Sequence, residues 1–343
     1  MNTKKKKLVV IGGGTGTYTI LSGLKHYKDI FDLTAIVAMT DSGGSTGRLR
    51  DEFGYLPVGD VRLALTALAN EEDEQQELIR KLFLHRFDTE GDVSGHNFGN
   101  LFLVALTDIL GSEELAIEAA ARVLNICGKV IPVTHEKVHL VAEYEDGRVV
   151  VGEHDIDEPR EHINSPIIKL SLTSPAQITK SAAQAIRSAD VVVFGPGDLY
   201  TSILANCVVR GMQEALRDTQ SELIYIPNLM TKKGQTTGKG VKEHINEISR
   251  YSGRTPDYVL INDVSFSHEL QNRYAKYGEY PVKQNYDGEN PKIITGDFLA
   301  SEEIIPKKGD VLRRSFIRHD PHKLAAVLVS VFGDKKTSSF TSF

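Results

Sequence analysis

The sequence predicts an α/β fold, a doubly wound and mostly parallel Rossmann-like sheet with a small antiparallel β-hairpin insertion. Short apolar runs rich in β-branched residues alternate with segments of helical periodicity, which is typical of parallel strands buried on both faces. Glycine-rich loops follow several of these runs, as in folds that bind ligands at the carboxyl ends of their strands. The 343 residues are 41% hydrophobic and 25% charged, a composition typical of globular proteins.

The chain opens with a βαβ unit. Residues 8–11 form a short apolar run that ends in glycine, residues 17–28 have apolar side chains at helical spacing, and residues 33–40 form the next apolar run. Further helices are predicted over residues 61–69, 74–87, 100–110, 113–124, 176–188, 199–216, 241–251, 269–274 and 321–332. Further strands are predicted over residues 167–172, 191–194, 223–227 and 258–263.

This alternation is interrupted between residues 129 and 154. Two strand-like runs, 138–144 and 148–154, flank the sequence Glu-Asp-Gly at 145–147, which is a strong signal for a tight hairpin turn. We therefore predict a small antiparallel insertion over about 129–154, in a chain that otherwise forms one domain from residue 1 to residue 343.

Composition and charge exclude several classes of protein. The formal net charge of −6 argues against non-specific nucleic-acid binding, which needs a basic surface. Cys127 and Cys207 lie far apart and outside metal-binding spacings, so we expect neither a disulfide framework nor a zinc site. The apolar run after the lysines at 4–7 is too short for a signal peptide, and no run approaches the about 20 residues of a membrane span. We expect a cytoplasmic protein without a nucleic-acid partner.

The first glycine loop lies between the first strand and the first helix and consists of Gly12, Gly13, Gly14, Thr15 and Gly16. Backbone N–H groups at a helix N-terminus bind phosphate, and glycine allows the ligand to approach closely. A dinucleotide fingerprint would need a third glycine where Thr17 stands, although Asp41 occurs near the position of a ribose-binding acid. NAD binding is therefore a weak alternative.

The second loop follows the next strand and combines a carboxylate, glycines, hydroxyls and a guanidinium, which suit a phosphorylated ligand. Its residues are Asp41, Ser42, Gly43, Gly44, Ser45, Thr46, Gly47 and Arg48. The loop would occupy the space that the ribose of NAD needs, which argues further against NAD. Asp41 is either a contact to Mg²⁺ or to a ligand hydroxyl, or else a turn residue.

Later loops at the predicted strand ends add further candidate binding residues. They are Gly59, Asp60 and Arg62, then His96, Asn97 and Asn100, then Gly195, Pro196, Gly197, Tyr200 and Thr201, and finally Asn228. Asp60 is as well suited to cap the helix at 61–69 as to bind a ligand. A lone histidine such as His96 is more often structural than catalytic, whereas Asn97 and Asn100 suit hydrogen bonds to a base or sugar. Together the loops predict a pocket for a phosphorylated, hydroxyl-rich ligand.

Taken in order, the segments GGGTG, TDSGGSTGRLRDE, LPVGDVR, SGHNFGN, GPGDLYTSIL and NLMT resemble the CofD-like family. Within that family they are most similar to the YvcK-like, gluconeogenesis-factor branch, and the resemblance extends from about residue 9 to residue 329. It implies a Rossmann-like fold, a nucleotide-type ligand and a C-terminal region, 255–335, that completes the ligand site.

The resemblance also implies binding of UDP-N-acetylglucosamine and a link to gluconeogenic growth, cell shape and peptidoglycan synthesis. Tyr274 and Arg318 match positions that the family uses for the sugar nucleotide, since a tyrosine ring suits stacking and a guanidinium suits a diphosphate. The other branch of the family is the phospholactate transferase of deazaflavin-coenzyme synthesis. It implies Mg²⁺-dependent chemistry, with Asp41 and Asp60 as candidate metal ligands.

Two functions remain open at this point. A regulatory protein that binds a sugar nucleotide without turnover is favoured, because the loops contain no convincing pair of nucleophile and general base. The alternative is a phosphotransferase that acts on a nucleotide-activated substrate, with Mg²⁺ as its cofactor. The sequence leaves the oligomeric state open, a homo-oligomer included, and identifies no protein partner.

Overall fold

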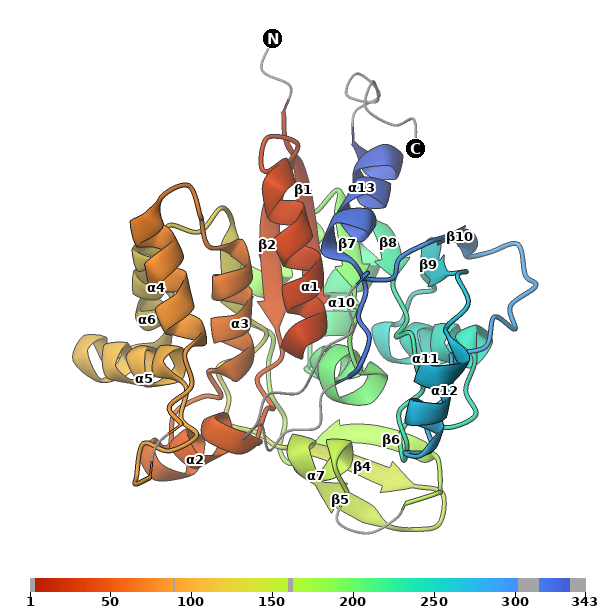
Figure 1. Ribbon diagram of the computed structural model, residues 1–343, viewed down its shortest axis with the longest axis horizontal. Helices are drawn as coiled ribbons and strands as arrows, with labels where there is room; N and C mark the ends of the chain where they lie inside the picture. The colour runs from red at the N-terminus through yellow and green to blue at the C-terminus, as the bar shows by residue number, and fades with distance from the viewer. Residues whose placement is uncertain (1–3, 89, 160–162, 302–314, 334–343) are drawn as a thin grey trace.

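A seven-stranded parallel sheet forms the centre of the molecule (Figure 1). The computed structural model describes residues 4–88, 90–159, 163–301 and 315–333. The strand order is β10-β9-β8-β7-β1-β2-β3, and all neighbours pair in parallel. The strands are β1 (Lys6–Gly12), β2 (Phe31–Val37), β3 (Lys129–Pro132), β7 (Val191–Phe194), β8 (Glu222–Tyr225), β9 (Tyr258–Asn262) and β10 (Lys292–Gly296). The predicted fold class is confirmed.

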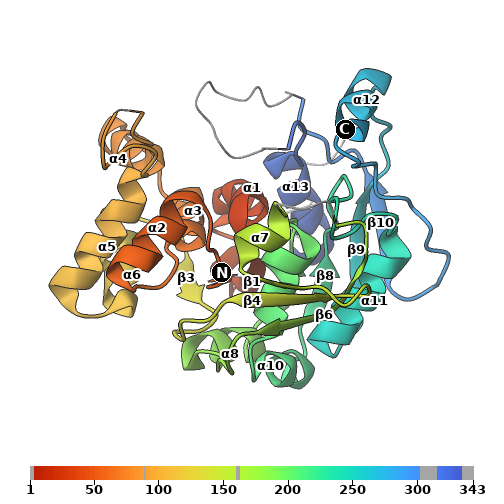
Figure 2. The ribbon, with the colours of Figure 1, turned by 90° about the horizontal axis from the view of Figure 1, so that it is seen from below.

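Helices cover both faces of this sheet, so it is doubly wound. Figure 2 shows α1 (Gly14–Leu24), α3 (Gly59–Leu68) and α13 (Pro321–Phe332) on one face, with α8 (Lys180–Arg187) and α10 (Met212–Asp218) on the other. The other long helices are α4 (Glu74–Leu84), α5 (Phe98–Leu110), α6 (Glu113–Val123), α11 (Val241–Ser252) and α12 (His268–Ala275), and η1 (Lys25–Tyr27) follows α1. Among the described residues, no helix has the length and apolar character needed to cross a membrane.

A three-stranded antiparallel sheet, of order β5-β4-β6, lies near the carboxyl ends of the main strands (Figure 1). Its strands are β4 (Leu140–Tyr144), β5 (Val149–Val151) and β6 (Ile167–Leu172), and a short helix, α7 (Glu153–Asp157), follows β5. The hairpin is confirmed, but the predicted bounds of the insertion were wrong at both ends. β3, assigned to it, pairs with β2 of the main sheet, while β6, assigned to the main sheet, pairs with β4.

Three local predictions also differ from the structure. The second glycine loop continues into a helix, α2 (Gly44–Phe53), where the sequence suggested a loop. The helix predicted over 199–216 is divided into η2 (Leu199–Leu204), α9 (Ala205–Cys207) and α10, because Gly211 adopts a left-handed conformation with φ of 88°. The edge strand β10 was not anticipated.

The strand order reverses direction beside β1, because β2 and β3 extend to one side of it and β7 to β10 extend to the other. Ile11 of β1 pairs with Phe194 of β7, so the loops after both strands leave the sheet at the same level. These two loops touch, since a Cβ on Gly16 would overlap the carbonyl oxygen of Pro196. Such a reversal is where doubly wound folds place their ligands.

Candidate functional site

A cavity of about 370 Å³ opens at this reversal point, over the carboxyl ends of the central strands. The predicted site residues that line it come from every loop except the one at 94–97. They are Gly13, Gly14, Thr15, Gly16, Asp41, Gly43, Gly44, Ser45, Thr46, Gly59, Asp60, Arg62, Asn100, Pro196, Gly197, Asn228, Tyr274 and Arg318. The predicted residues Gly12, Ser42, Gly47, Arg48, His96, Asn97, Gly195, Tyr200 and Thr201 lie outside its lining.

The first glycine loop presents the N-terminus of α1 to the cavity. Gly14 has a φ of 62°, which favours glycine, and its N–H donates to Asp60 Oδ1 at 2.8 Å. The N–H groups of Thr15 and Gly16 receive no acceptor from the described residues. They are therefore available to an anion, with the positive end of the helix dipole behind them.

The second glycine loop presents the N-terminus of α2 to the same cavity. Gly44 begins this helix with a φ of 50°, and the N–H groups of Gly44, Ser45 and Thr46 receive no acceptor from the described part of the chain. Gly43 differs, because its N–H donates to Asp41 Oδ1 at 2.9 Å. Two helix N-termini thus supply the donors of one wall, which we call the glycine wall and define as residues 13–16 and 43–46.

Two partly buried carboxyl groups, those of Asp41 and Asp60, lie beside these helix ends. Burial raises the pKa of Asp41, and burial together with the charge of Asp41 raises the pKa of Asp60 to about 7. Gly59 packs closely against the first of them, since a Cβ there would lie 2.6 Å from Asp41 Oδ2 and 2.5 Å from Thr46 Oγ1. The structure corrects the capping hypothesis for Asp60, because Val58 is the N-cap of α3 and the Asp60 carboxylate bonds to Gly14 instead.

These two carboxylates could hold a cation only with help from a ligand. Among the described residues, no group of three or more histidine, cysteine, aspartate or glutamate side chains is arranged to hold a metal ion. Mg²⁺ is commonly bound by one or two carboxylates together with substrate phosphates. Asp41 and Asp60 fit that pattern, since they lie beside the open N–H groups where phosphate oxygens would bind.

The segment at 94–100 supports the glycine wall from behind. Asn97 N and Asn100 Nδ2 each donate to Ser45 Oγ at 3.3 Å, so the Ser45 hydroxyl proton is directed to His96 Nδ1 at 3.1 Å. With all its hydrogen-bonding capacity used, Ser45 is unsuited to act as a nucleophile although it neighbours a histidine. Asn100 Oδ1 also accepts from Arg62 Nε at 2.8 Å. His96 and Asn97 therefore position α2 instead of reaching the cavity.

Several other predicted residues likewise lie outside the cavity lining and form hydrogen bonds that hold the surrounding structure in place. Ser42 Oγ accepts from His154 N at 3.1 Å, and Arg48 Nη2 donates to Ser94 O at 2.8 Å. Tyr200 is fully buried, and its hydroxyl bonds to Lys239. Further hydrogen bonds within the framework engage Gly12 O and Gly47 N, while Gly195 and Thr201 are buried beside the loop after β7.

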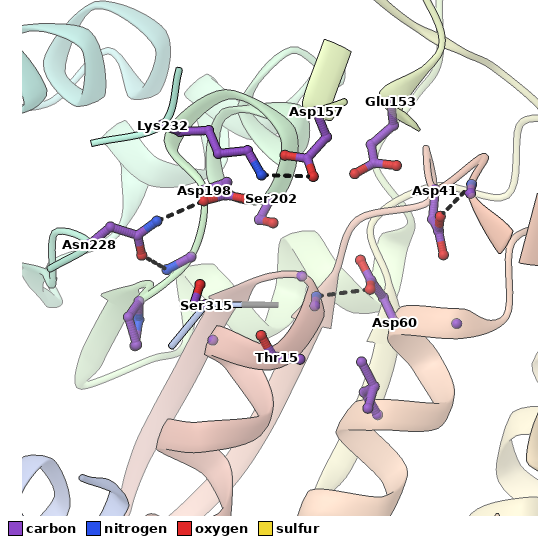
Figure 3. Close-up of a pocket in the computed structure, with 18 of the residues that line it drawn as sticks. Thr15, Asp41, Asp60, Glu153, Asp157, Asp198, Ser202, Asn228, Lys232 and Ser315 are labelled. Carbon is purple, nitrogen blue, oxygen red and sulfur yellow. Dashed lines mark hydrogen bonds and ion pairs between the residues drawn. The ribbon is translucent and has the colours of Figure 1, made fainter. Parts of the chain in front are cut away.

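The opposite side of the cavity is acidic and was largely missed in the sequence. Figure 3 shows Glu153 and Asp157, both from α7, across the cavity from Thr15 and Asp60. With Asp198, Lys232 and Glu279 they form what we call the acidic wall. No local pattern identifies this set, because α7 begins within the last residues of the strand predicted over 148–154 and continues beyond it, and the other members come from three distant loops.

An ion pair within the acidic wall joins α7 to the loop that follows β8. Lys232 Nζ lies 3.1 Å from Asp157 Oδ2, and Gln235 Nε2 donates to Asp157 Oδ1 at 3.0 Å. Burial opposes the charge of Lys232, but Asp198, Asp157 and Glu279 outweigh it and raise the pKa of the amine. Burial raises the pKa of Asp198 to about 7, against the opposing effect of Lys232.

Amide and carboxyl groups organise the rest of this side. Asn228 Nδ2 donates to Asp198 Oδ1 at 2.8 Å, and Asn228 Oδ1 accepts from Gly197 N at 3.1 Å. Burial and the charges of Asp41 and Asp157 raise the pKa of Glu153 well above its usual value. Carboxyl and amide groups of this kind suit the hydroxyl and amide groups of a sugar better than they suit phosphate.

The C-terminal segment 315–319, which we call the strap, closes a third side. Tyr274 is 2% exposed, its ring packs edge-on against Phe316 at 5.1 Å, and its hydroxyl accepts from Ile317 N at 3.1 Å. The predicted stacking face of Tyr274 is therefore largely used inside the protein, although part of the residue still lines the cavity. The strap brings Arg318 and His319 to the cavity as well.

Comparisons with known proteins agree over nearly the whole chain. A family model described as 2-phospho-L-lactate transferase CofD matches residues 8–299. A Thermotoga maritima protein whose name contains the words gluconeogenesis factor is 42% identical over 322 residues, 94% of this chain and 98% of that protein. The gluconeogenesis factor of Bacillus subtilis is 38% identical over 96% of this chain and 98% of its own length. A crystal structure of a Bacillus halodurans protein has a TM-score of 0.83 and 35% identity, and covers 95% of this chain and 100% of that one.

Proposed function

We propose that this chain, which belongs to the CofD family, binds a nucleotide sugar of the UDP-N-acetylglucosamine type as a regulatory protein without turnover. The convergence of two helix N-termini on one cavity carries the proposal. Thr15 and Gly16 on one helix, and Gly44 to Thr46 on the other, offer open N–H donors to the two phosphates of a diphosphate. A monophosphate would use only one of these helix ends.

The acidic wall supports the sugar half of the proposal. Its carboxyl groups would repel a phosphate but accept hydrogen bonds from sugar hydroxyl groups. The cavity is therefore polar in two different ways, with donors on the glycine wall and acceptors on the acidic wall. A nucleotide sugar matches this arrangement, because its diphosphate accepts hydrogen bonds and its sugar hydroxyl groups donate them.

Binding without turnover is supported by the state of Ser45, which lines the cavity while its partner His96 lies behind it. Ser45 donates to His96 and accepts from Asn97 and Asn100, so it has no lone pair left for attack. Because relatives over nearly the full length are named gluconeogenesis factors, we further propose that the bound nucleotide sugar couples gluconeogenic growth to cell shape and cell-wall synthesis.

Thermal unfolding of the pure protein with UDP-N-acetylglucosamine, UDP, GDP and NAD, each with and without Mg²⁺, tests the proposal. A ligand that binds only the folded state adds about 2.7 kcal/mol of stability at a hundredfold excess over Kd. We expect UDP-N-acetylglucosamine to give the largest shift and Arg318→Ala to reduce it. A clear response to GDP with Mg²⁺, beside none to either uridine compound, would overturn the proposal.

The second candidate is a Mg²⁺-dependent phosphotransferase of the phospholactate transferase type. The partly buried pair Asp41 and Asp60 favours it, because a cation would offset both the burial and the repulsion from Asp41 that raise the pKa of Asp60. A bound Mg²⁺ would polarise the phosphoryl oxygens and neutralise their charge. We expect Asp41→Asn to abolish metal-dependent binding under this hypothesis. Unchanged binding by the variant would instead make Asp41 a structural residue.

A further inference from the structure

The strap holds a buried histidine whose ring forms no hydrogen bond with the described part of the chain. His319 is 6% exposed and lines the cavity, yet none of the described residues forms a hydrogen bond with its imidazole ring. Burial alone lowers the pKa of His319 to about 4, so the ring is neutral near pH 7 and carries one N–H donor and one acceptor. A buried polar group of this kind ordinarily has a partner.

The other two buried histidines each have a protein partner on one ring nitrogen, although Nε2 of His244 is buried without a partner among the described residues. His96 Nδ1 lies 3.1 Å from Ser45 Oγ, and His244 Nδ1 lies 3.2 Å from Tyr225 OH. His244 is 1% exposed and lies away from the cavity, whereas His319 faces it. His319, whose ring has no partner among the residues that the structure describes, is thus one that a ligand can reach.

The backbone around His319 is firmly held, so its position is set before any ligand arrives. Leu299 and His319 form an antiparallel bridge, Ala300 N donates to Arg318 O at 3.0 Å, and Asp320 N donates to Phe298 O at 2.8 Å. Asp320 then caps α13 by accepting from His322 N at 2.8 Å. A rigid backbone on both sides reduces the entropy lost when a side chain engages a ligand.

We propose that His319 is a ligand-contacting residue, whose neutral imidazole hydrogen-bonds to an uncharged hydroxyl, amide or carbonyl group of the bound nucleotide sugar. An uncharged group is favoured because the open N–H groups for phosphate lie on the glycine wall. Burial is the only cause of the lowered pKa of His319, and no charged group among the described residues shifts it upward. This inference rests on the proposed function. It adds a specificity contact on the strap, next to Arg318.

The test replaces His319 with leucine and measures two quantities, the unfolding midpoint without ligand and the affinity for UDP-N-acetylglucosamine by calorimetry. Loss of one hydrogen bond to the ligand corresponds to a roughly tenfold weaker Kd. The midpoint without ligand should stay unchanged or rise, because leucine removes a buried polar group that has no protein partner. A structural role for the imidazole would instead lower the midpoint.

His244→Leu is the matched control, because it removes a buried histidine that has a protein partner and lies outside the cavity. It should lower the midpoint and leave the affinity unchanged. His319→Gln keeps a donor and an acceptor and should retain part of the affinity that leucine loses.

The outcomes separate this inference from the function on which it rests. If the wild type binds and His319→Leu binds equally well, the inference is wrong while the proposed function stands. If the wild type binds none of the nucleotides tested, the proposed function fails. In that case a lower midpoint for ligand-free His319→Leu overturns the inference, and an unchanged or higher midpoint still supports a site for another ligand.

Discussion

The glycine wall and the acidic wall face one cavity but are built by different means. The glycine wall consists of backbone N–H groups at the starts of α1 and α2, each placed by a loop that directly follows a strand. The acidic wall consists of side chains from α7 and from the segments at 198, 232 and 279, which meet only in the folded protein. The first is a property of local sequence, and the second is a property of the tertiary arrangement.

This difference determines which substitutions each wall can accommodate. Backbone donors depend on close approach between loops, so a single added Cβ can displace them. Side-chain acceptors depend on a balance of charges. A substitution in the acidic wall therefore changes its electrostatic free energy without displacing the backbone. The two walls should therefore respond differently to mutation and to pH.

The largest expected effect comes from Gly16→Ala. The new Cβ would overlap the carbonyl oxygen of Pro196, and neither backbone can move without shifting β1 or β7. We expect a loss of about 3 kcal/mol or more in the free energy of unfolding. Urea denaturation measures it. Gly43→Ala is the control in the other glycine loop, because its Cβ would come no closer than 3.4 Å to His154. Equal stability of the two variants would contradict the close packing of the loops after β1 and β7.

The next effect comes from Lys232→Met on the acidic wall. Lys232 and Asp157 are 20% and 23% exposed and lie 3.1 Å apart, and removal of the lysine leaves several carboxyl groups without their cation. We expect a cost of about 2 kcal/mol, less than for a fully buried pair. Chemical denaturation at pH 7.5 provides the measurement.

Lys81→Met supplies the comparison for this prediction, because it breaks an exposed helical pair with Glu77. A pair of this type contributes about 0.5 kcal/mol or less. If Lys232→Met were no more destabilising than Lys81→Met, the acidic wall would not depend on its lysine.

The smallest effect is a dependence of stability on pH. The pKa of Asp60 is raised to about 7 in the folded protein, above its ordinary value in the unfolded chain. The folded state therefore binds the proton more tightly, and this stabilisation is complete below about pH 4 and is lost as the pH rises through 7. Linkage with a pKa of about 7 allows a loss of at most about 2.7 kcal/mol between pH 5 and pH 8. Because Asp60 is only partly buried, solvent screening reduces the loss that we expect from the ligand-free wild type to about 1 kcal/mol.

Asp60→Asn should reduce that slope and stabilise the protein at pH 8, since the amide oxygen can still accept from Gly14 N. Urea midpoints at several pH values give the slope, and Asp29→Asn on the exposed surface should leave it unchanged. An identical slope for Asp60→Asn and the wild type would show that Asp60 ionises normally. Asp198, whose pKa is also raised to about 7, accounts for part of the remaining slope.

The parts of the site that the sequence predicted share one physical property. The loops at 12–16, 41–48 and 195–197 each follow a buried strand, and parallel strands end at the same edge of the sheet. Their convergence therefore follows once the strands are recognised. Tyr274 and Arg318 came from family resemblance alone, and the structure gives Tyr274 a supporting contact to the strap.

The predictions that failed depend on contacts between distant segments. Asp60 precedes the helix predicted over 61–69 as an N-cap would, but it lies within α3, and its carboxylate accepts from Gly14 N, 46 residues away. β6 has the apolar character of a main-sheet strand but pairs with β4, because the hairpin before it offers a free edge. Asn97 was expected to face the ligand, yet its Oδ1 caps α5 by accepting from Gly99 N at 2.9 Å.

The sequence by itself determined the doubly wound sheet, the hairpin and the glycine loops, because hydrophobic periodicity and glycine conformation are local properties. Only the tertiary structure decided which loop residues reach the cavity and which support it from behind. It also decided that α7 brings Glu153 and Asp157 opposite the helix N-termini, and that His319 lines the cavity without a hydrogen bond from its ring to any described residue. The reason is physical, since burial and the pairing of charged groups depend on neighbours that the chain supplies from far along its length.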